Sequence, residues 1–167
     1  MPAQLGLRLV RTEANSQRNS YALEVVGDRE GGRELWHPKI DGAIRSAGLS
    51  AGSRIGNISF PLRSGRSKQQ GVDAHVQESS FFPWRHDIYN VKDLDALKGR
   101  GWGAQIRRWI VQDFIDAYGT NAVISHDESL STEARESLHA IGINPERTYP
   151  IEEYARILDA YLARKKA

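Results

Sequence analysis

The chain has 167 residues, enough for one domain of ordinary size with its own hydrophobic core. Hydrophobic residues make up 40% and charged residues 26% of it, both near the averages of soluble globular proteins. The absence of cysteine excludes disulfides and cysteine-ligated metals, and the net charge of +2 permits contact with anions without requiring it. No apolar run approaches the roughly 20 residues of a membrane span and the N-terminus lacks secretory features, so we expect a cytoplasmic protein without membrane contact.

Four elements are expected in the first part of the chain. Alternating apolar and polar residues predict strands at Leu5–Val10 and Tyr21–Val26, separated by a polar loop over Thr12–Ser20. Pro38–Ala47 fits a short helix, because its proline falls in the first turn and a glycine follows its end. Arg54–Leu62 is predicted as a third strand.

Residues 62–72 are predicted to form a mobile surface loop, because Arg63–Gly71 contains no apolar residue. Both a solvated linker and a basic loop that steers an anionic substrate fit this composition. A strand pair is expected next, at Ala74–Trp84 and Arg85–Val91, with Pro83 at the bend.

The clearest helix lies between Gly103 and Gly119. Its apolar residues recur at three- and four-residue steps and form one stripe: Ile106, Trp109, Ile110, Phe114 and Tyr118. Arg107 and Arg108 are expected on the opposite, polar side.

The last part of the chain completes an α/β pattern. Ala122–Ser125 is short and β-branched, as in a buried strand. Either Ser131 or Ser129 is suited to cap a helix that stops at Gly142, and a final amphipathic helix starts near Pro150. The order of elements predicts a single domain with a central mixed, mostly antiparallel sheet flanked by helices.

One motif indicates a binding site: the segment Lys98–Gly103, which lies between a predicted strand and the clearest helix. Glycine at every second position allows several backbone N–H groups to face one anion, and the helix that follows adds its unpaired N-terminal amides. Lys98 and Arg100 add positive charge, so the segment predicts a pyrophosphate site, with a tight strand-to-helix turn as the alternative. The P-loop and dinucleotide patterns do not match.

This segment resembles the pyrophosphate loop of the GNAT acyltransferases, Gln/Arg-x-x-Gly-x-Gly/Ala, with Lys98 in place of glutamine or arginine. The family continues with a helix, a strand and a second helix that reads Asn-x-x-Ala and then Gly-Phe. Ser131–Ala134 and Gly142–Ile143 fall at that spacing. The resemblance covers about residues 87–143 and implies a GNAT-like fold with an atypical helical C-terminus.

The resemblance implies an N-acyltransferase that uses acetyl-CoA as co-substrate. The acyl-CoA would lie between two parallel strands, Arg85–Val91 and Ala122–Ser125, and an acceptor amine would attack the thioester directly. The amine would belong to a small molecule, a protein or a nucleobase, and no metal is required. The implied cofactor-binding residues are Val91, Lys98, Gly99, Arg100, Gly101, Trp102, Gly103, Ala104 and Ser131.

Three residues are candidates for the general base. His86 and Asp87 lie on the strand that often carries the base in this family, and His126 closes the strand after the long helix. A histidine pKa near 6.5 suits proton transfer at neutral pH. Glu78, on the preceding strand, is expected to be exposed.

The acid that protonates the leaving thiolate is less clear. The position of the family's tyrosine falls at Leu138, which cannot donate a proton, so Tyr149 or Tyr118 would have to substitute. Trp102 either packs under the loop or covers the cofactor.

Two other functions remain open. A non-catalytic GNAT-like binding module is indicated by Leu138 and by the altered C-terminus. A nucleic-acid-binding protein would use the arginines of Arg63–Lys68 and the pair Arg107 and Arg108, with binding that weakens steeply as salt is added.

Overall fold

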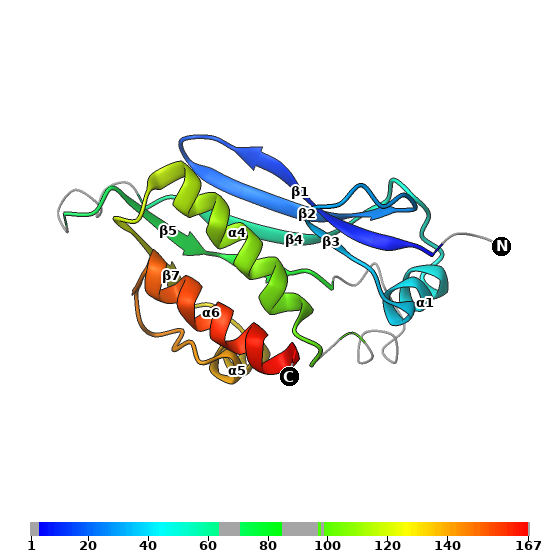
Figure 1. The fold of residues 1–167 in the computed structure, drawn as a ribbon. Coiled ribbons are helices and arrows are strands. Elements are labelled where there is room, and N and C mark those ends of the chain that lie inside the picture. Colours follow the sequence, from blue (N-terminus) through cyan, green and yellow to red (C-terminus); the bar gives the residue numbers. More distant parts are fainter. Residues whose placement is uncertain (1–3, 64–70, 85–96, 98, 167) are drawn as a thin grey trace.

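Two sheets that meet along one extended segment form the framework of this protein (Figure 1). They are seen in a computed structural model that describes residues 4–63, 71–84, 97 and 99–166. The first sheet is antiparallel, with the strand order β3-β1-β2-β4-β6, and the second has the order β5-β7-β8. The strands are β1 (Gly6–Ala14), β2 (Arg18–Val26), β3 (Glu34–Leu35), β4 (Arg54–Pro61), β5 (Ala74–Glu78), β6 (Ser80–Phe82), β7 (Ala122–His126) and β8 (Tyr149–Pro150).

Helices flank these sheets, which confirms the predicted mixed α/β class with an antiparallel sheet. They are α1 (Pro38–Ser46), α4 (Trp102–Tyr118), α5 (Thr132–Ile141) and α6 (Ile151–Lys166). In the view of Figure 1, α4 and α6 lie side by side in front of the strands, and α1 lies at the far end beside β1. These helices of the described residues were expected from their terminal residues and periodicity.

The first hairpin is longer than predicted. The sequence predicts a loop over Thr12–Ser20, but β1 and β2 stay paired out to Ala14 and Asn19. The side chain of Asn15 accepts hydrogen bonds from the amides of Gln17 and Arg18 and closes a tight turn. The prediction of a long loop was wrong because cross-strand pairing holds polar residues in strands as readily as apolar ones.

One extended segment, Ala74–Phe82, joins the two sheets. On one side it runs antiparallel to β4, from the bridge between Leu62 and Val76 to the pair Asn57 and Phe82. On the other side only its first five residues pair in parallel with β7, and this pairing ends at Glu78 opposite His126. The segment therefore leaves β7 after Glu78 while it continues along β4.

This arrangement corrects the predicted neighbour of β7. The sequence predicts Arg85–Val91 as the parallel partner of Ala122–Ser125, whereas β7 pairs with β5 on one side and with β8 on the other. Residues 85–91 lie outside the described part of the chain. Residues 64–70, most of the loop predicted over 62–72, also lie outside it. Arg63, within the predicted range, donates its amide to the carbonyl oxygen of His75. The parallel partner of β7 is therefore β5, which lies earlier in the sequence than the predicted segment. Strand pairing depends on contacts between residues far apart in the sequence, which local patterns do not reveal.

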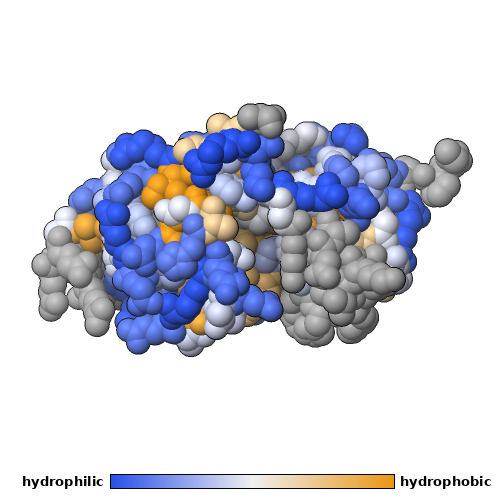
Figure 2. Space-filling view, turned by 90° about the horizontal axis from the view of Figure 1, so that it is seen from below, coloured by the Kyte–Doolittle hydropathy of each residue, from blue (hydrophilic) through white to orange (hydrophobic). Residues whose placement is uncertain are grey.

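The core lies between the strands and the pair α4 and α6. Its largest fully buried side chains include Phe60, Phe114 and Tyr154. The face seen in Figure 2 is largely hydrophilic, with apolar residues gathered in a limited patch. Among the described residues, none of the helices combines the length and the apolar character needed to cross a membrane.

Candidate functional site

The first part of the site is the glycine loop, Gly99–Gly103, which leads into α4. Gly99 and Gly101 have φ angles of +75° and +84°, in the left-handed region that favours glycine. Gly101 is the N-cap of α4 and contributes no side-chain cap, and the first intrahelical bond runs from Gln105 N to Gly101 O. The amides of Trp102, Gly103 and Ala104 therefore have no partner within the helix, which is the arrangement that binds anions.

Positive charge surrounds the glycine loop. Arg100 is exposed, and its Cζ lies 5.6 Å from the ring centre of Trp102. Lys165, near the end of α6, donates from Nζ to the carbonyl oxygen of Gly99 at 3.1 Å. No acidic residue occupies the first turn of α4. The predicted charge of Lys98 falls on a residue outside the described part of the chain.

Trp102 connects the glycine loop to two other elements. Its ring centre lies 5.2 Å from that of His37, the N-cap of α1, and 6.3 Å from that of Trp84, which follows β6. All three rings are half-buried. Trp102 thus packs against other aromatic side chains and keeps part of its ring exposed beside the loop.

The second part of the site is the buried polar chain, made of Glu78, Arg107, Tyr154 and His126. Glu78 and Arg107 form an ion pair with exposed fractions of only 1% and 5%. Nη1 of Arg107 donates to Oη of Tyr154 at 3.4 Å, and Oη lies 3.0 Å from Nε2 of His126. The ring of Phe81 lies 3.9 Å from Cζ of Arg107 and completes its enclosure. The chain therefore links β5, α4, α6 and β7 at the point where β5 and β7 part.

The donors and acceptors of the buried polar chain favour one tautomer of His126. A guanidinium can only donate, so Arg107 uses a lone pair of the Tyr154 oxygen. The hydroxyl proton of Tyr154 then finds an acceptor in Nε2 of His126, 3.0 Å from Oη, only if Nε2 carries no proton, and this arrangement leaves fewer buried groups unpaired. A neutral imidazole with Nε2 as acceptor carries its proton on Nδ1. Among the described residues, this buried Nδ1 has no hydrogen-bond partner.

Burial also decides the charge states. Desolvation, with a smaller contribution from the charge of Arg107, lowers the pKa of His126 to about 3. Burial raises the pKa of Tyr154, which therefore keeps its proton. At neutral pH His126 is uncharged, and because Nε2 already accepts a hydrogen bond it is a poor proton acceptor in this arrangement.

The other predicted catalytic residues are only partly placed. His86 and Asp87 lie outside the described residues, as does Val91 among the predicted cofactor-binding residues. Tyr149 is buried in β8, where its Oη accepts the amide of Asn144 at 2.8 Å and its ring meets that of Tyr154 edge to face. It therefore lies beside the buried polar chain.

Two predicted cofactor-binding residues have clear structural surroundings. Ser131 is the N-cap of α5, where its hydroxyl accepts the amide of Ala134 at 3.2 Å. The side chain of Ala104 is buried in the core, so its backbone amide is the group it offers to the loop. Leu138 is also buried in the core.

Three residues of the buried polar chain were not recognised from the sequence. Glu78 was expected to be exposed and Arg107 to lie on the polar side of its helix, and both predictions were wrong. Each charge is buried because the other neutralises it across two elements. A signal for Arg107 exists, because Val111 and Phe114 follow it by four and seven residues on the same helical face and both are buried. Tyr154 was assigned only to an apolar stripe.

The same burial weakens the prediction of a basic nucleic-acid surface. Arg107 is enclosed and Arg108 pairs with Asp159, with Nε 2.8 Å from Oδ1. Neither guanidinium forms part of an unpaired basic patch. Residues 64–68 of the other predicted basic segment, Arg63–Lys68, lie outside the described residues.

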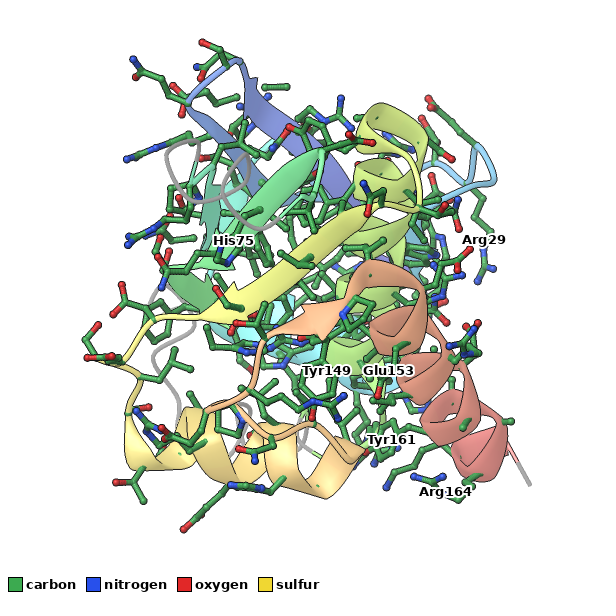
Figure 3. The ribbon with its side chains drawn as sticks, turned by 90° about the vertical axis from the view of Figure 1, so that its left-hand side faces the viewer. Arg29, His75, Tyr149, Glu153, Tyr161 and Arg164 are labelled. Carbon is green, nitrogen blue, oxygen red and sulfur yellow. The ribbon has the colours of Figure 1, made fainter. Side chains whose placement is uncertain are left out.

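A second buried pair lies on β5 and β7. Nε2 of His75 and Oγ of Ser125 are 2.7 Å apart, and both side chains are buried. His75 is labelled in Figure 3, and because successive residues of a strand alternate between faces, it lies on the opposite face of β5 from Glu78. This pair is therefore separate from the buried polar chain.

No group of three His, Asp or Glu side chains that could hold a metal occurs in the part of the chain that the structure describes. Comparisons with protein-family models, with curated proteins and with solved structures find no match to this chain.

Proposed function

We propose that this protein is an acyl-CoA-dependent N-acyltransferase with a GNAT-like fold, which moves an acetyl group from CoA to an amine. The observation that carries the proposal is the position of the parting strands relative to the glycine loop. β5 and β7 are parallel and separate after Glu78 and His126. Ligands of α/β proteins commonly bind at the carboxyl ends of parallel strands, where neighbouring strands diverge.

The glycine loop lies at this same end of the strands. α4 connects the segment Ala74–Phe82 to β7, so it runs back along two parallel strands and begins near their carboxyl ends. The ion pair between Arg107, in the second turn of α4, and Glu78, the last residue of β5, supports this placement. A ligand with a pyrophosphate on the loop amides would extend toward the parting strands, as an acyl-CoA requires.

The reaction needs few chemical groups from the protein. The amine nitrogen attacks the thioester carbonyl carbon, an N–C bond forms, and the C–S bond breaks. A base removes one proton from the amine, and the thiolate gains one. His86 and Asp87 remain the proposed bases, because Glu78 is held by Arg107 and His126 is neutral with Nε2 occupied.

Calorimetric titration with acetyl-CoA tests the proposal, and Gly103 provides a clean variant. A Cβ at Gly103 would meet no atom within 4 Å, and this glycine is not among those with positive φ, so we expect Gly103→Leu to fold, which circular dichroism checks. Gly101 is unsuitable for this test, because its φ of +84° strains any substitution. Gly42→Leu in α1 is the matched control, since a Cβ there also meets open space.

We expect wild type and Gly42→Leu to bind acetyl-CoA, and Gly103→Leu to lose about tenfold or more in affinity because its side chain obstructs the loop amides. Equal binding by all three variants would remove the glycine loop from the proposal. Absence of binding by wild type at millimolar ligand would overturn the proposed function.

A binding module without turnover is the second candidate, and the surroundings of the tyrosines favour it. Leu138 carries no acid, Oη of Tyr149 accepts the amide of Asn144, and Oη of Tyr118 accepts from Asn19. Both hydroxyls thus have structural partners. Binding of acetyl-CoA without transfer to any amine in an acceptor screen would distinguish this candidate from the enzyme.

A further inference from the structure

The buried polar chain contains two donors without an acceptor among the described residues: Nε of Arg107, enclosed between Glu78 and the ring of Phe81, and Nδ1 of His126, at the end of β7. Nδ1 of His126 carries a proton, because Nε2 accepts from Tyr154, and it has no partner among the described residues. A buried polar group left unpaired loses its hydrogen bonds to water and gains none in return, so native proteins rarely keep one without a use. The unpaired Nδ1–H of His126 therefore indicates that the acceptor belongs to a ligand.

The charge balance of the buried polar chain limits which ligand atom can accept the hydrogen bond from Nδ1 of His126. The carboxylate of Glu78 offsets the guanidinium of Arg107, while Tyr154 and His126 are neutral. A second anion here would be buried without a counter-charge, which is strongly unfavourable. An uncharged oxygen such as a carbonyl brings no such penalty. Phosphate groups fit the glycine loop instead, where Arg100 and Lys165 supply charge near open amides.

The position of His126 fits a ligand that reaches past the glycine loop. His126 is the last paired residue of β7, opposite Glu78, and beyond this pair the amide of Asp127 still donates to the carbonyl oxygen of Glu78. After that bond the described residues show no further pairing between the two strands. If the strands separated further beyond Asp127, a ligand could reach the buried Nδ1 of His126. This separation would break none of the hydrogen bonds between β5 and β7.

We infer that Nδ1–H of His126 donates a hydrogen bond to the thioester carbonyl oxygen of the bound acyl-CoA, with Arg107 and Tyr154 as positioning residues that hold the required tautomer. This inference rests on the proposed function, since it assigns one atom of that ligand to one atom of the protein. The hydrogen bond would strengthen as negative charge develops on the oxygen during attack by the amine.

Two substitutions of His126 separate the ring nitrogens. Asparagine places an amide nitrogen near the position of Nδ1, whereas glutamine places its polar atoms near the position of Nε2. His126→Asn therefore retains a donor for the ligand, and His126→Gln retains a partner for Tyr154 without that donor. Titration of wild type and both variants with acetyl-CoA and with CoA, which lacks the carbonyl, measures the contribution of the carbonyl contact.

We expect His126→Gln to lose about tenfold in affinity for acetyl-CoA with little change for CoA, and His126→Asn to keep most of the preference for acetyl-CoA. An unchanged ratio of the two affinities in His126→Gln overturns the inference while the proposed function stands. If wild type binds neither ligand, the proposed function fails and the inference falls with it.

Nitrogen-15 NMR of the wild-type imidazole keeps the test independent of how well the variants fold. The expected spectrum has the proton on Nδ1 in the free protein, and the resonance of this proton shifts when acetyl-CoA is added but much less with CoA. A proton on Nε2, or equal shifts with both ligands, overturns the inference.

Discussion

The hydroxyl of Tyr154 lies between Nη1 of Arg107 at 3.4 Å and Nε2 of His126 at 3.0 Å, and so couples a buried charge to a buried neutral ring. Arg107 and Tyr154 are 47 positions apart in the sequence, and Tyr154 and His126 are 28 apart. One tyrosine of α6 thereby joins α4 to the end of β7. The stability of this contact depends on which protonation state each group holds.

Acid should destabilise this protein through His126. The folded-state pKa is depressed from 6.5 to about 3, so between these values the unfolded chain binds a proton that the folded protein excludes. Stability attributable to His126 is therefore fully present above about pH 6.5 and is lost as the pH falls toward 3. The loss is about 1.4 kcal/mol per pH unit within this window, up to several kcal/mol. Urea unfolding at pH 7, 5 and 4 measures it.

His126→Gln should show a shallower decline of stability between pH 7 and 4 than wild type, because glutamine does not titrate. His139→Gln, at an exposed position on α5, is the control and should decline as wild type does. Parallel pH dependences of wild type and His126→Gln would show that His126 is not the group excluded from protonation.

Removal of one partner of the Glu78–Arg107 pair should cost more than removal of both. Glu78→Gln leaves the guanidinium buried without a counter-charge, at a cost of about 3–5 kcal/mol. The double variant Glu78→Leu with Arg107→Met should recover much of this loss, since it leaves no buried charge. Urea midpoints of Glu78→Gln, of Arg107→Met alone and of the double variant give the comparison. A double variant less stable than either single one would contradict the account.

The two glycines at the start of α4 should respond to alanine in opposite directions. Gly101→Ala places a Cβ at a φ of +84°, at a cost of about 1–2 kcal/mol, and within reach of the side chains of Leu162 and Lys165. Gly103→Ala meets open space inside a helix and should stabilise by about 0.5–1 kcal/mol. Thermal unfolding followed by circular dichroism distinguishes them, and equal shifts in Tm would be inconsistent with this backbone geometry.

Asp113 should prove the main polar attachment of α4 to the first sheet. Its carboxylate accepts a hydrogen bond from Tyr21 at 2.9 Å and pairs with Arg11 at 2.8 Å and Arg33 at 2.7 Å. Asp113→Ala leaves these donors without their shared acceptor and should destabilise by about 1–3 kcal/mol. Asp116→Ala, three residues further along α4, removes only an exposed contact with Gln112 and should cost less than 0.5 kcal/mol, as is usual for surface positions. Similar urea midpoints for the two variants would show that the cluster contributes little.

The buried ion pair between Glu78 and Arg107 is a feature that local sequence patterns do not predict. The sequence places Arg107 beside Arg108 on a helix, and the two residues have the same side chain. Arg107 is buried because a carboxylate on β5 meets it, while Arg108 remains near the surface beside Asp159. Arg107 and Arg108 differ in the residues of other elements that contact them, and no pattern within α4 predicts those contacts.

The pairing of the strands also depends on contacts that local sequence patterns do not predict. β5 and β6 fall within the predicted strand Ala74–Trp84, yet their neighbours on the two sides come from β4 and β7. The parallel partner of β7 was predicted at Arg85–Val91, and the structure has β5 instead. Parallel pairing depends on the path of the intervening helix, so residues adjacent in the chain do not specify it.

By itself, the sequence determined where the helices begin and end and where glycine must interrupt them. Ser131, Gly119 and Gly142 act as caps, as their positions in the sequence predict, because capping hydrogen bonds and left-handed turns involve only a few neighbouring residues. Only the tertiary structure decided that Glu78, Arg107, Tyr154 and His126 form one buried chain. Burial of a charged or polar side chain is stable only with a partner, and here each partner arrives from a different element of the fold.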